Sequence, residues 1–157
     1  MFLRDILHRK GTEVQTIAPG ATLAAVIEQL IEFNIGSLVV CEMTSTGSAR
    51  MIGIITERDL LRTIQARRGP FERLTVSEIM SPDLVTASPD DGLEDAMQLT
   101  TYRRVRHLPI VDEDQLLGIV SIGDIVKVHH DRLVMENYYM RSYIQGEGAE
   151  VGTMDWQ

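Results

Sequence analysis

The sequence contains an internal repeat, and this repeat constrains the fold more than any other feature. Residues 16–19 (TIAP) match residues 86–89 (TASP), 70 positions further on, and residues 35–40 (IGSLVV) match residues 105–110 (VRHLPI) at the same offset. The offset then shortens to 65, where residues 53–60 (GIITERDL) match residues 118–125 (GIVSIGDI). The difference is a polar loop that is longer in the first copy than in the second. Two copies of one structural unit are therefore expected.

Each copy has the pattern of a small α/β unit. One predicted helix is apolar at the spacing of a single face, through Leu23, Val26, Ile27, Leu30 and Ile31. The second copy of this face is weaker, because Thr100 and Thr101 occupy two of the five positions. With the β-rich segments around them, the pattern predicts strand, helix, strand, strand, helix in each copy. Such a unit leaves part of its sheet bare, so the two copies are predicted to pack together with pseudo-twofold symmetry.

The repeat also predicts the organisation of the chain. We assign residues 1–67 to the first copy, 68–75 to a linker that contains Gly69 and Pro70, 76–128 to the second copy, and 129–157 to an extension and a frayed tail. The last helix is expected to run past the repeat to about residue 145. It carries apolar residues at near-heptad spacing, interrupted by two polar ones: Val126, His130, Leu133, Asn137, Met140 and Ile144.

Composition and charge exclude several functions. The formal net charge of −8 disfavours binding to nucleic acid. No apolar run is long enough for a membrane span and the first ten residues do not resemble a secretory leader, so a cytoplasmic protein is expected. The single cysteine, Cys41, lies in an apolar run and is interpreted as a buried residue. Adjacent His129 and His130 point about 100° apart on a helix and cannot chelate a metal together. No nucleophile with a base beside it supports catalysis.

The motif Gly-apolar-apolar-Thr/Ser-x-x-Asp-apolar is the most similar segment of the two copies. In each copy it lies where a predicted strand ends and a predicted helix begins. Its polar residues are Thr56 and Asp59 in the first copy, and Ser121 and Asp124 in the second. One interpretation is a capping box that only starts the helix. The other is an anion site, in which free helix amides and a hydroxyl bind phosphate while the carboxylate accepts ribose hydroxyls. Recurrence after matched units favours the second interpretation.

A basic cluster precedes the second Leu-Pro strand, with Arg103, Arg104, Arg106 and His107 close together in an otherwise acidic chain. We interpret it as an anion-binding group; the alternative is a solvated helix end that complements the helix dipole. The first copy has no such group, because Gly36 and Ser37 stand where the second copy has Arg106 and His107. The two predicted sites are therefore expected to differ.

Residues 14–128 as a whole resemble a tandem pair of cystathionine β-synthase (CBS) motifs, also called a Bateman module, of the stand-alone bacterial kind. The resemblance rests on three segments of the second copy: residues 85–89 (VTASP), 107–110 (HLPI) and 118–124 (GIVSIGD). It implies an α/β fold in which ligands bind in two clefts between the paired motifs. The family's ligands are AMP, ADP, ATP, S-adenosylmethionine and sometimes NAD(H).

By this resemblance, Asp59 and Asp124 would hold ribose, while Thr56 and Ser121 would bind phosphate. Basic residues would reach phosphate across the cleft mouth, and the adenine would lie against backbone at the start of each copy and at Pro109. The full set of expected binding residues is Thr16, Ile17, Thr56, Arg58, Asp59, Thr86, Arg104, Arg106, His107, Pro109, Ser121, Ile122 and Asp124.

The resulting expectation is a non-catalytic sensor of adenine nucleotides. AMP, ADP or ATP would be the ligand, NAD(H) the alternative and S-adenosylmethionine a lesser candidate. Binding would bias the packing of the pair and thereby a homodimer or the contact with an unidentified protein partner. Whether the last helix also forms a tetramer is left open by the sequence. The rival hypothesis is a scaffold without ligand, in which both phrases only cap helices and the last helix docks a partner.

Overall fold

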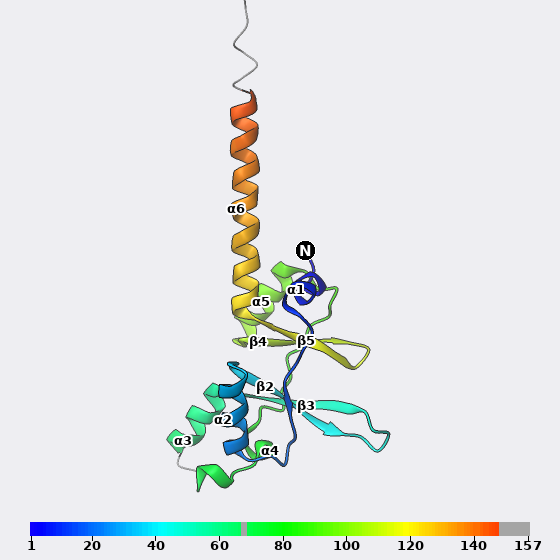
Figure 1. The fold of residues 1–157 in the computed structure, drawn as a ribbon, viewed down its shortest axis with the longest axis vertical. Coiled ribbons are helices and arrows are strands. Elements are labelled where there is room, and N and C mark those ends of the chain that lie inside the picture. The colour runs from blue at the N-terminus through cyan, green and yellow to red at the C-terminus, as the bar shows by residue number, and fades with distance from the viewer. Residues whose placement is uncertain (67–68, 148–157) are drawn as a thin grey trace, which may run out of the picture.

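A computed structural model describes residues 1–66 and 69–147, in which two similar halves lie one above the other (Figure 1). In the first half, β1 (Thr16–Ile17), β2 (Ser37–Met43) and β3 (Ala49–Thr56) form one sheet. β1 is parallel to β2, which is antiparallel to β3. Helix α2 (Leu23–Glu32) joins the first two strands, and α3 (Glu57–Ala66) follows the third. The predicted order of elements is confirmed here.

The second half repeats this order with one difference. It contains α5 (Leu93–Arg103), β4 (His107–Asp112), β5 (Gln115–Ser121) and α6 (Ile122–Glu147). The expected opening strand is reduced to a single parallel bridge between Ala87 and Ile110.

Proline chemistry accounts for the shorter pairing in the second half. In the first half, the Val39 amide donates to the Gln15 carbonyl at 3.3 Å and extends the contact between β1 and β2. The corresponding residue 70 positions on is Pro109, which has no N–H to donate. The carbonyl of Pro109 still accepts from Ala87 at 3.0 Å, so the segment stays attached to the sheet.

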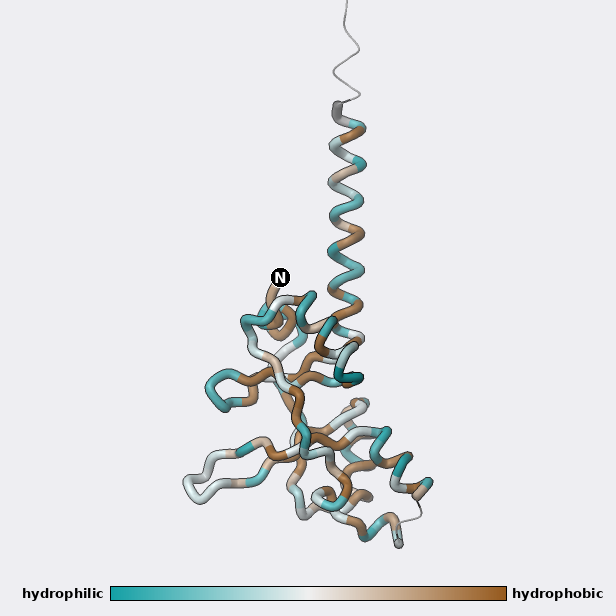
Figure 2. Tube along the Cα trace, turned by 180° about the vertical axis from the view of Figure 1, so that it is seen from behind, coloured by the Kyte–Doolittle hydropathy of each residue, from teal (hydrophilic) through white to brown (hydrophobic). Residues whose placement is uncertain are grey.

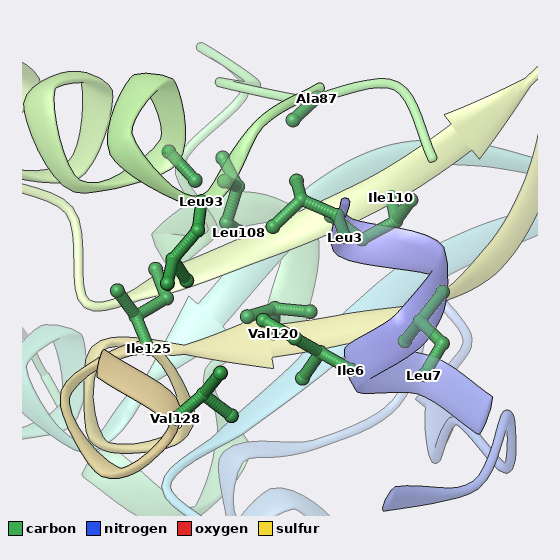
Figure 3. Close-up of a cluster of buried hydrophobic side chains, with 11 residues drawn as sticks. Leu3, Ile6, Leu7, Ala87, Leu93, Leu108, Ile110, Val120, Ile125 and Val128 are labelled. Atoms are coloured by element: carbon green, nitrogen blue, oxygen red, sulfur yellow. The ribbon is translucent and has the colours of Figure 1, made fainter. Parts of the chain in front are cut away.

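Two short helices exchange places between the halves. Helix α1 (Leu3–Lys10) precedes the first copy, yet its apolar residues Leu3, Ile6 and Leu7 are buried in the core of the second half (Figure 3). Helix α4 (Val76–Ile79) precedes the second copy, yet Val76 is buried in the core of the first half. Each core is therefore completed by the helix that precedes the other copy, so the two halves depend on each other.

The exchanged helices are held by equivalent backbone hydrogen bonds. The Leu3 amide donates to the Asp91 carbonyl at 3.0 Å, and the Val76 amide donates to the Ala21 carbonyl at 2.9 Å. Asp91 and Ala21 are themselves 70 positions apart, so the pseudo-symmetry extends to these contacts. The sequence pattern did not predict α1 as part of the fold.

The glycine that opens each repeated phrase lies directly against the exchanged segment. A Cβ on Gly118 would lie 2.6 Å from Cδ2 of Leu7, and one on Gly53 would lie 2.6 Å from Sδ of Met80. Both distances are shorter than real Cβ contacts, so a side chain at either position would require the flexible ends of Leu7 and Met80 to move. The repeated glycines thus make room for packing between the halves.

The segment between the copies is packed against the first half. A 3-10 turn, η1 (Phe71–Arg73), contacts α2, and the Leu23 amide donates to the Leu74 carbonyl at 2.9 Å. Residues 67 and 68 and residues 148–157 of the expected tail lie outside the described part of the chain, whereas residues 146 and 147, also expected in the tail, belong to the last helix, α6 (Ile122–Glu147).

Helix α6 begins in the body of the protein and then projects from it (Figure 1). Ile125 and Val128 are buried in the second core, but every residue from 130 to 145 is exposed. Its bounds confirm the predicted extension past the repeat. Along the projecting part, apolar and polar residues alternate in short runs (Figure 2). Of the helices in residues 1–66 and 69–147, none has the length and apolar character needed to cross a membrane.

Candidate functional site

A cavity of about 600 Å³ lies between the two halves, within the usual size range of small-molecule sites. One side is formed by the end of β3 and the start of α3, and the other by the turn after α5 and the start of β4. The polar and charged residues on its walls are Thr56, Glu57, Arg58, Asp59, Arg62, Ser81, Asp83, Arg104, Arg106, His107 and Ser121. The cavity therefore combines groups from both copies of the repeat.

Thr56 and Asp59 form a capping box at the start of α3, as their spacing predicts. Oδ2 of Asp59 accepts from the amide and the hydroxyl of Thr56, at 2.8 and 3.0 Å. The Asp59 amide donates to Oγ1 of Thr56 at 3.4 Å. Both residues line the cavity and are half-buried. The cap thus fixes a carboxylate and a helix N-terminus at the cavity wall, so the two interpretations of the phrase are compatible here.

Ser121 and Asp124 form the same box at the start of α6, but the surroundings of Asp124 differ. Oδ2 of Asp124 accepts from the amide and the hydroxyl of Ser121, both at 2.8 Å. It also accepts from Nζ of Lys10 at 2.6 Å, and the same ammonium donates to the Ile119 carbonyl at 3.1 Å. Ser121 lines the cavity, whereas Asp124 does not. The exchanged helix α1 therefore places a cation on the second carboxylate.

The environment of Asp124 favours its ionised form. Burial alone would raise the pKa of this carboxyl, but the hydrogen bonds from Lys10 and Ser121 outweigh that effect and hold the pKa below its usual value. The two exchanged segments can be aligned by placing Leu3 on Val76, which make equivalent hydrogen bonds. In this alignment, Asp83 occupies the position of Lys10. Lys10 therefore binds Asp124, whereas its counterpart Asp83 is an acidic residue that lines the same cavity as Asp59.

Lys10→Met tests the ion pair through its pH dependence. The ion pair is partly exposed, with side-chain exposures of 41% and 26%, so the substitution should lower the free energy of unfolding at neutral pH by about 1 kcal/mol. A carboxyl with a lowered folded pKa stabilises the fold above its unfolded pKa, and this stabilisation is lost as the pH falls through the folded pKa. The difference between the two proteins should therefore vanish on acidification, as measured by urea unfolding at stepwise lower pH. Lys127→Met removes an equal charge from an exposed site and should show no such pH dependence.

The basic cluster faces the cavity in part. Arg104 and Arg106 line it together with Arg58 and Arg62 of α3, whereas Arg103 pairs with Asp83 at 3.6 Å. Four arginines thus face three carboxylates, in a chain whose formal net charge is −8. The cavity is locally basic in an acidic protein, which suits an anionic ligand.

Arg104 adopts a backbone conformation that side chains other than Asn and Gly rarely occupy. Its φ of 53° is left-handed, and the equivalent residue of the first copy, Asn34, has a φ of 50°. Asn tolerates this conformation and Arg does so less readily. This conformation at the C-cap ends α5 and places Arg104 at the cavity wall.

His107 lies on the same wall, and its lowered pKa favours the neutral ring at neutral pH. Burial is the main cause of its lowered pKa, and the positive charges of Lys10 and Arg106 act in the same direction. Gly36 of the first copy lies beside the ring, since a Cβ at this position would be 3.4 Å from Nε2, an ordinary van der Waals distance. His107 is therefore a neutral hydrogen-bonding group in the cavity.

The structure brings together nine of the thirteen residues expected from the sequence. Those that line the cavity are Thr56, Arg58, Asp59, Arg104, Arg106, His107, Pro109, Ser121 and Ile122. The other four do not line it. Thr16 and Ile17 form β1, Thr86 precedes the bridge at Ala87, and Asp124 binds Lys10.

Several cavity residues were missed by the sequence reasoning. They include Ser81, Asp83, Leu84 and Val85, which precede the matched segment that begins at Thr86. Ser81 is brought to the site by backbone pairing with Ile54, whose amide donates to its carbonyl at 3.2 Å. Ser81, Asp83 and Leu84 lie outside the repeat pattern, whereas Val85 opens the segment 85–89 on which the family resemblance rests, and its place beside Thr86 could have indicated the site.

This architecture defines a tandem α/β repeat module with a charged cavity between its halves. The chain belongs to the CBS domain family: the family's sequence profile matches residues 3–66 and 76–131. Pairs of CBS domains are generally regulatory modules rather than catalysts, and they often bind adenine-containing ligands.

Similar proteins agree with this assignment. The CBS domain-containing protein YhcV of Bacillus subtilis is 38% identical over 116 residues, which cover 73% of this chain and 77% of that protein. The crystal structure of a CBS-domain containing protein from Agrobacterium tumefaciens matches with a TM-score of 0.75 at 32% identity, covering 82% of this chain and 99% of that one. A CBS domain pair in complex with 5′-methylthioadenosine and S-adenosyl-L-methionine has the same fold, with a TM-score of 0.71 at 22% identity over 84% of this chain and 98% of that one.

Proposed function

We propose that this chain is a regulatory module that binds one adenine nucleotide, an AMP-like ligand, in the cavity between its halves. The proposal rests on groups from both halves that line one cavity. The first half contributes Thr56 and Asp59 at the capped N-terminus of α3, and the second half contributes Arg104 and Arg106. A ligand with a sugar and a phosphate matches this pairing of carboxylate and arginines. A CBS pair of the same fold holds two adenosine-derived ligands, which supports the choice of adenine.

Each part of the proposed ligand has a chemical partner in the cavity. Asp59 accepts hydrogen bonds from the ribose hydroxyls. The phosphate lies between the start of α3 and the guanidinium groups of Arg58, Arg104 and Arg106, where the helix dipole and the positive charges act together. Apolar residues on the walls, Ile54, Leu84, Val85 and Pro109, provide the surface for the base.

The second, pseudo-equivalent site does not bind nucleotide in this proposal. The ammonium of Lys10 takes the position beside Asp124 that a ribose would need. The segment preceding β2 also lacks the arginines found before β4. One ligand per chain is therefore expected.

Regulation follows from a ligand that contacts both halves. The carboxylate that holds ribose comes from the first copy, and two of the three guanidinium groups that hold phosphate come from the second. Nucleotide binding would favour one relative packing of the halves over another by its differential affinity for the two states. ADP, ATP or NAD(H) would act through the same groups, and S-adenosylmethionine would use the arginines least because it has no phosphate.

We also propose that the module is a homodimer through the helices of its two halves. Large apolar side chains on three of these helices are exposed, with relative exposures of 74% for Ile31, 67% for Leu61, 56% for Ile64 and 87% for Tyr102. Apolar groups gathered on the helices of one domain are typical of protein interfaces.

Calorimetric titration with AMP, ATP, NADH and S-adenosylmethionine tests the proposed function. We expect saturable binding of a phosphate-bearing adenine ligand at one site per chain, and recovery of that ligand unchanged after long incubation. Absence of both heat and thermal stabilisation with all four compounds would contradict the proposal and support the scaffold hypothesis. Conversion of the ligand would contradict its regulatory, non-catalytic character.

A further inference from the structure

The projecting part of α6 exposes large apolar side chains along its length. The whole helix has 26 residues and is about 39 Å long at 1.5 Å per residue. Large apolar side chains along its projecting part are between 45% and 69% exposed: Leu133, Val134, Met135, Tyr138, Tyr139, Met140, Tyr143 and Ile144. Helices gain most of their stability from packing of such residues, so this segment is suited to a packing partner.

One line of residues on α6 has the spacing of a coiled-coil seam. The α6 seam, as defined here, consists of Val126, His130, Leu133, Asn137, Met140 and Ile144, which alternate at intervals of four and three. Val126, Leu133 and Met140 occupy d positions, and the others occupy a positions. The seam is turned about 100° from Ile125, which faces the second core, so the body of the protein leaves it accessible.

We propose that the α6 seam packs against the same seam of a second copy of this chain, as a parallel, in-register, two-stranded coiled coil. Asn137 at an a position is the first reason. In a parallel pair it meets Asn137 of the partner subunit and the two amides can bind each other. In an antiparallel pair, a positions face d positions, where the amide would meet an apolar residue without a hydrogen-bonding partner.

Charge complementarity beside the seam is the second reason. Glu136 lies at a g position and Arg141 at the following e position, the two positions that approach each other across a parallel coiled coil. The Glu136 carboxylate of each chain therefore meets the Arg141 guanidinium of the other. Within one chain Glu136 accepts from Arg132 at 2.9 Å, so the carboxylate would be shared between the two arginines.

This contact is separate from the proposed dimerisation through α2, α3 and α5, and it does not depend on nucleotide. A parallel seam places both cavities on the same end of the assembly, because both bodies then lie at the N-terminal end of the paired helices.

Disulfide trapping in the full chain tests the proposal. In a Cys41→Ser background, Asn137→Cys and Ile144→Cys place thiols in the seam one heptad apart, whereas Ser142→Cys places a thiol on the outer face of the helix. On mild oxidation we expect dimeric cross-links several-fold faster at 137 and 144 than at 142. An antiparallel pair allows self-linking at only one of the two seam positions, so failure at either, or an equal rate at 142, would overturn the parallel seam.

Charge reversal gives a second readout in the Ile144→Cys protein, which keeps Asn137. Arg141→Glu should slow cross-linking several-fold, because two carboxylates then meet, and the double change Glu136→Arg with Arg141→Glu should restore the rate. Circular dichroism checks that the helix is retained in each variant. If Arg141→Glu leaves the rate unchanged, or if the double change does not restore it, the pairing is wrong. Neither result bears on nucleotide binding, which the titration tests alone.

Discussion

Asp59→Asn should weaken nucleotide binding by about 30-fold, which corresponds to about 2 kcal/mol, while Asp124→Asn should leave it little changed. The carbonyl oxygen of an asparagine can still accept from the Thr56 amide and hydroxyl, so the cap of α3 is largely kept. What is lost is the charge that holds the ribose hydroxyls, and hydrogen bonds to a charged acceptor are the strong ones. Titration calorimetry with the ligand that binds the unmodified protein measures the effect.

Asp124→Asn is a closely matched control because the two aspartates make the same capping box. Oδ2 of each accepts from the residue three positions earlier, at 2.8 Å from the amide in both copies. Only the surroundings differ, since Asp59 lines the cavity and Asp124 binds Lys10. Equal losses of affinity in the two variants would show that the effect comes from the helix caps, and the assignment of the ligand to this cavity would be wrong.

Replacing the two arginines of the second copy should remove the preference for phosphate. In the double variant Arg104→Asn with Arg106→Ala, the affinity for AMP should fall at least about tenfold, while that for adenosine should remain the same. Asn is the residue of the first copy at the position of Arg104 and tolerates the left-handed backbone there, so the turn should be preserved. Titrations with adenosine, AMP and ATP separate the phosphate contribution from that of the rest of the ligand.

Arg103→Ala controls for the general loss of positive charge. Arg103 is adjacent in sequence but pairs with Asp83 instead of lining the cavity, so its removal should change AMP affinity much less. If adenosine and AMP lose affinity equally in the double variant, the arginines act on the shape of the cleft and do not contact phosphate. If Arg103→Ala weakens AMP binding as much as the double variant does, long-range charge is responsible.

Local relations in the sequence predicted much of the fold. The repeat predicted the order of elements in both halves, and the three-residue spacing of Thr56 and Asp59 predicted a capping box whose hydrogen bonds are present. The apolar spacing predicted a last helix that runs to about residue 145, and α6 spans Ile122–Glu147 within the described residues. These features depend on groups a few positions apart, whose geometry is set by the helix or strand that contains them.

Contacts between distant parts of the chain could not be predicted in this way. Leu3, Ile6 and Leu7 look like any short apolar helix face, and nothing in their spacing indicates that they complete the core of the second half. Pro109 likewise shortens the strand pairing only because it lies opposite the segment around Ala87, to which it cannot donate a hydrogen bond.

The sequence by itself determined that the chain consists of two similar α/β units, each with a capped helix and an aspartate. Only the tertiary structure decided that these aspartates differ, because Lys10 lies 114 positions from Asp124 and reaches it through the exchange of α1. The capping box depends only on residues three positions apart, so it forms in both copies. The difference between the copies arises from packing, which brings a different neighbour to each aspartate.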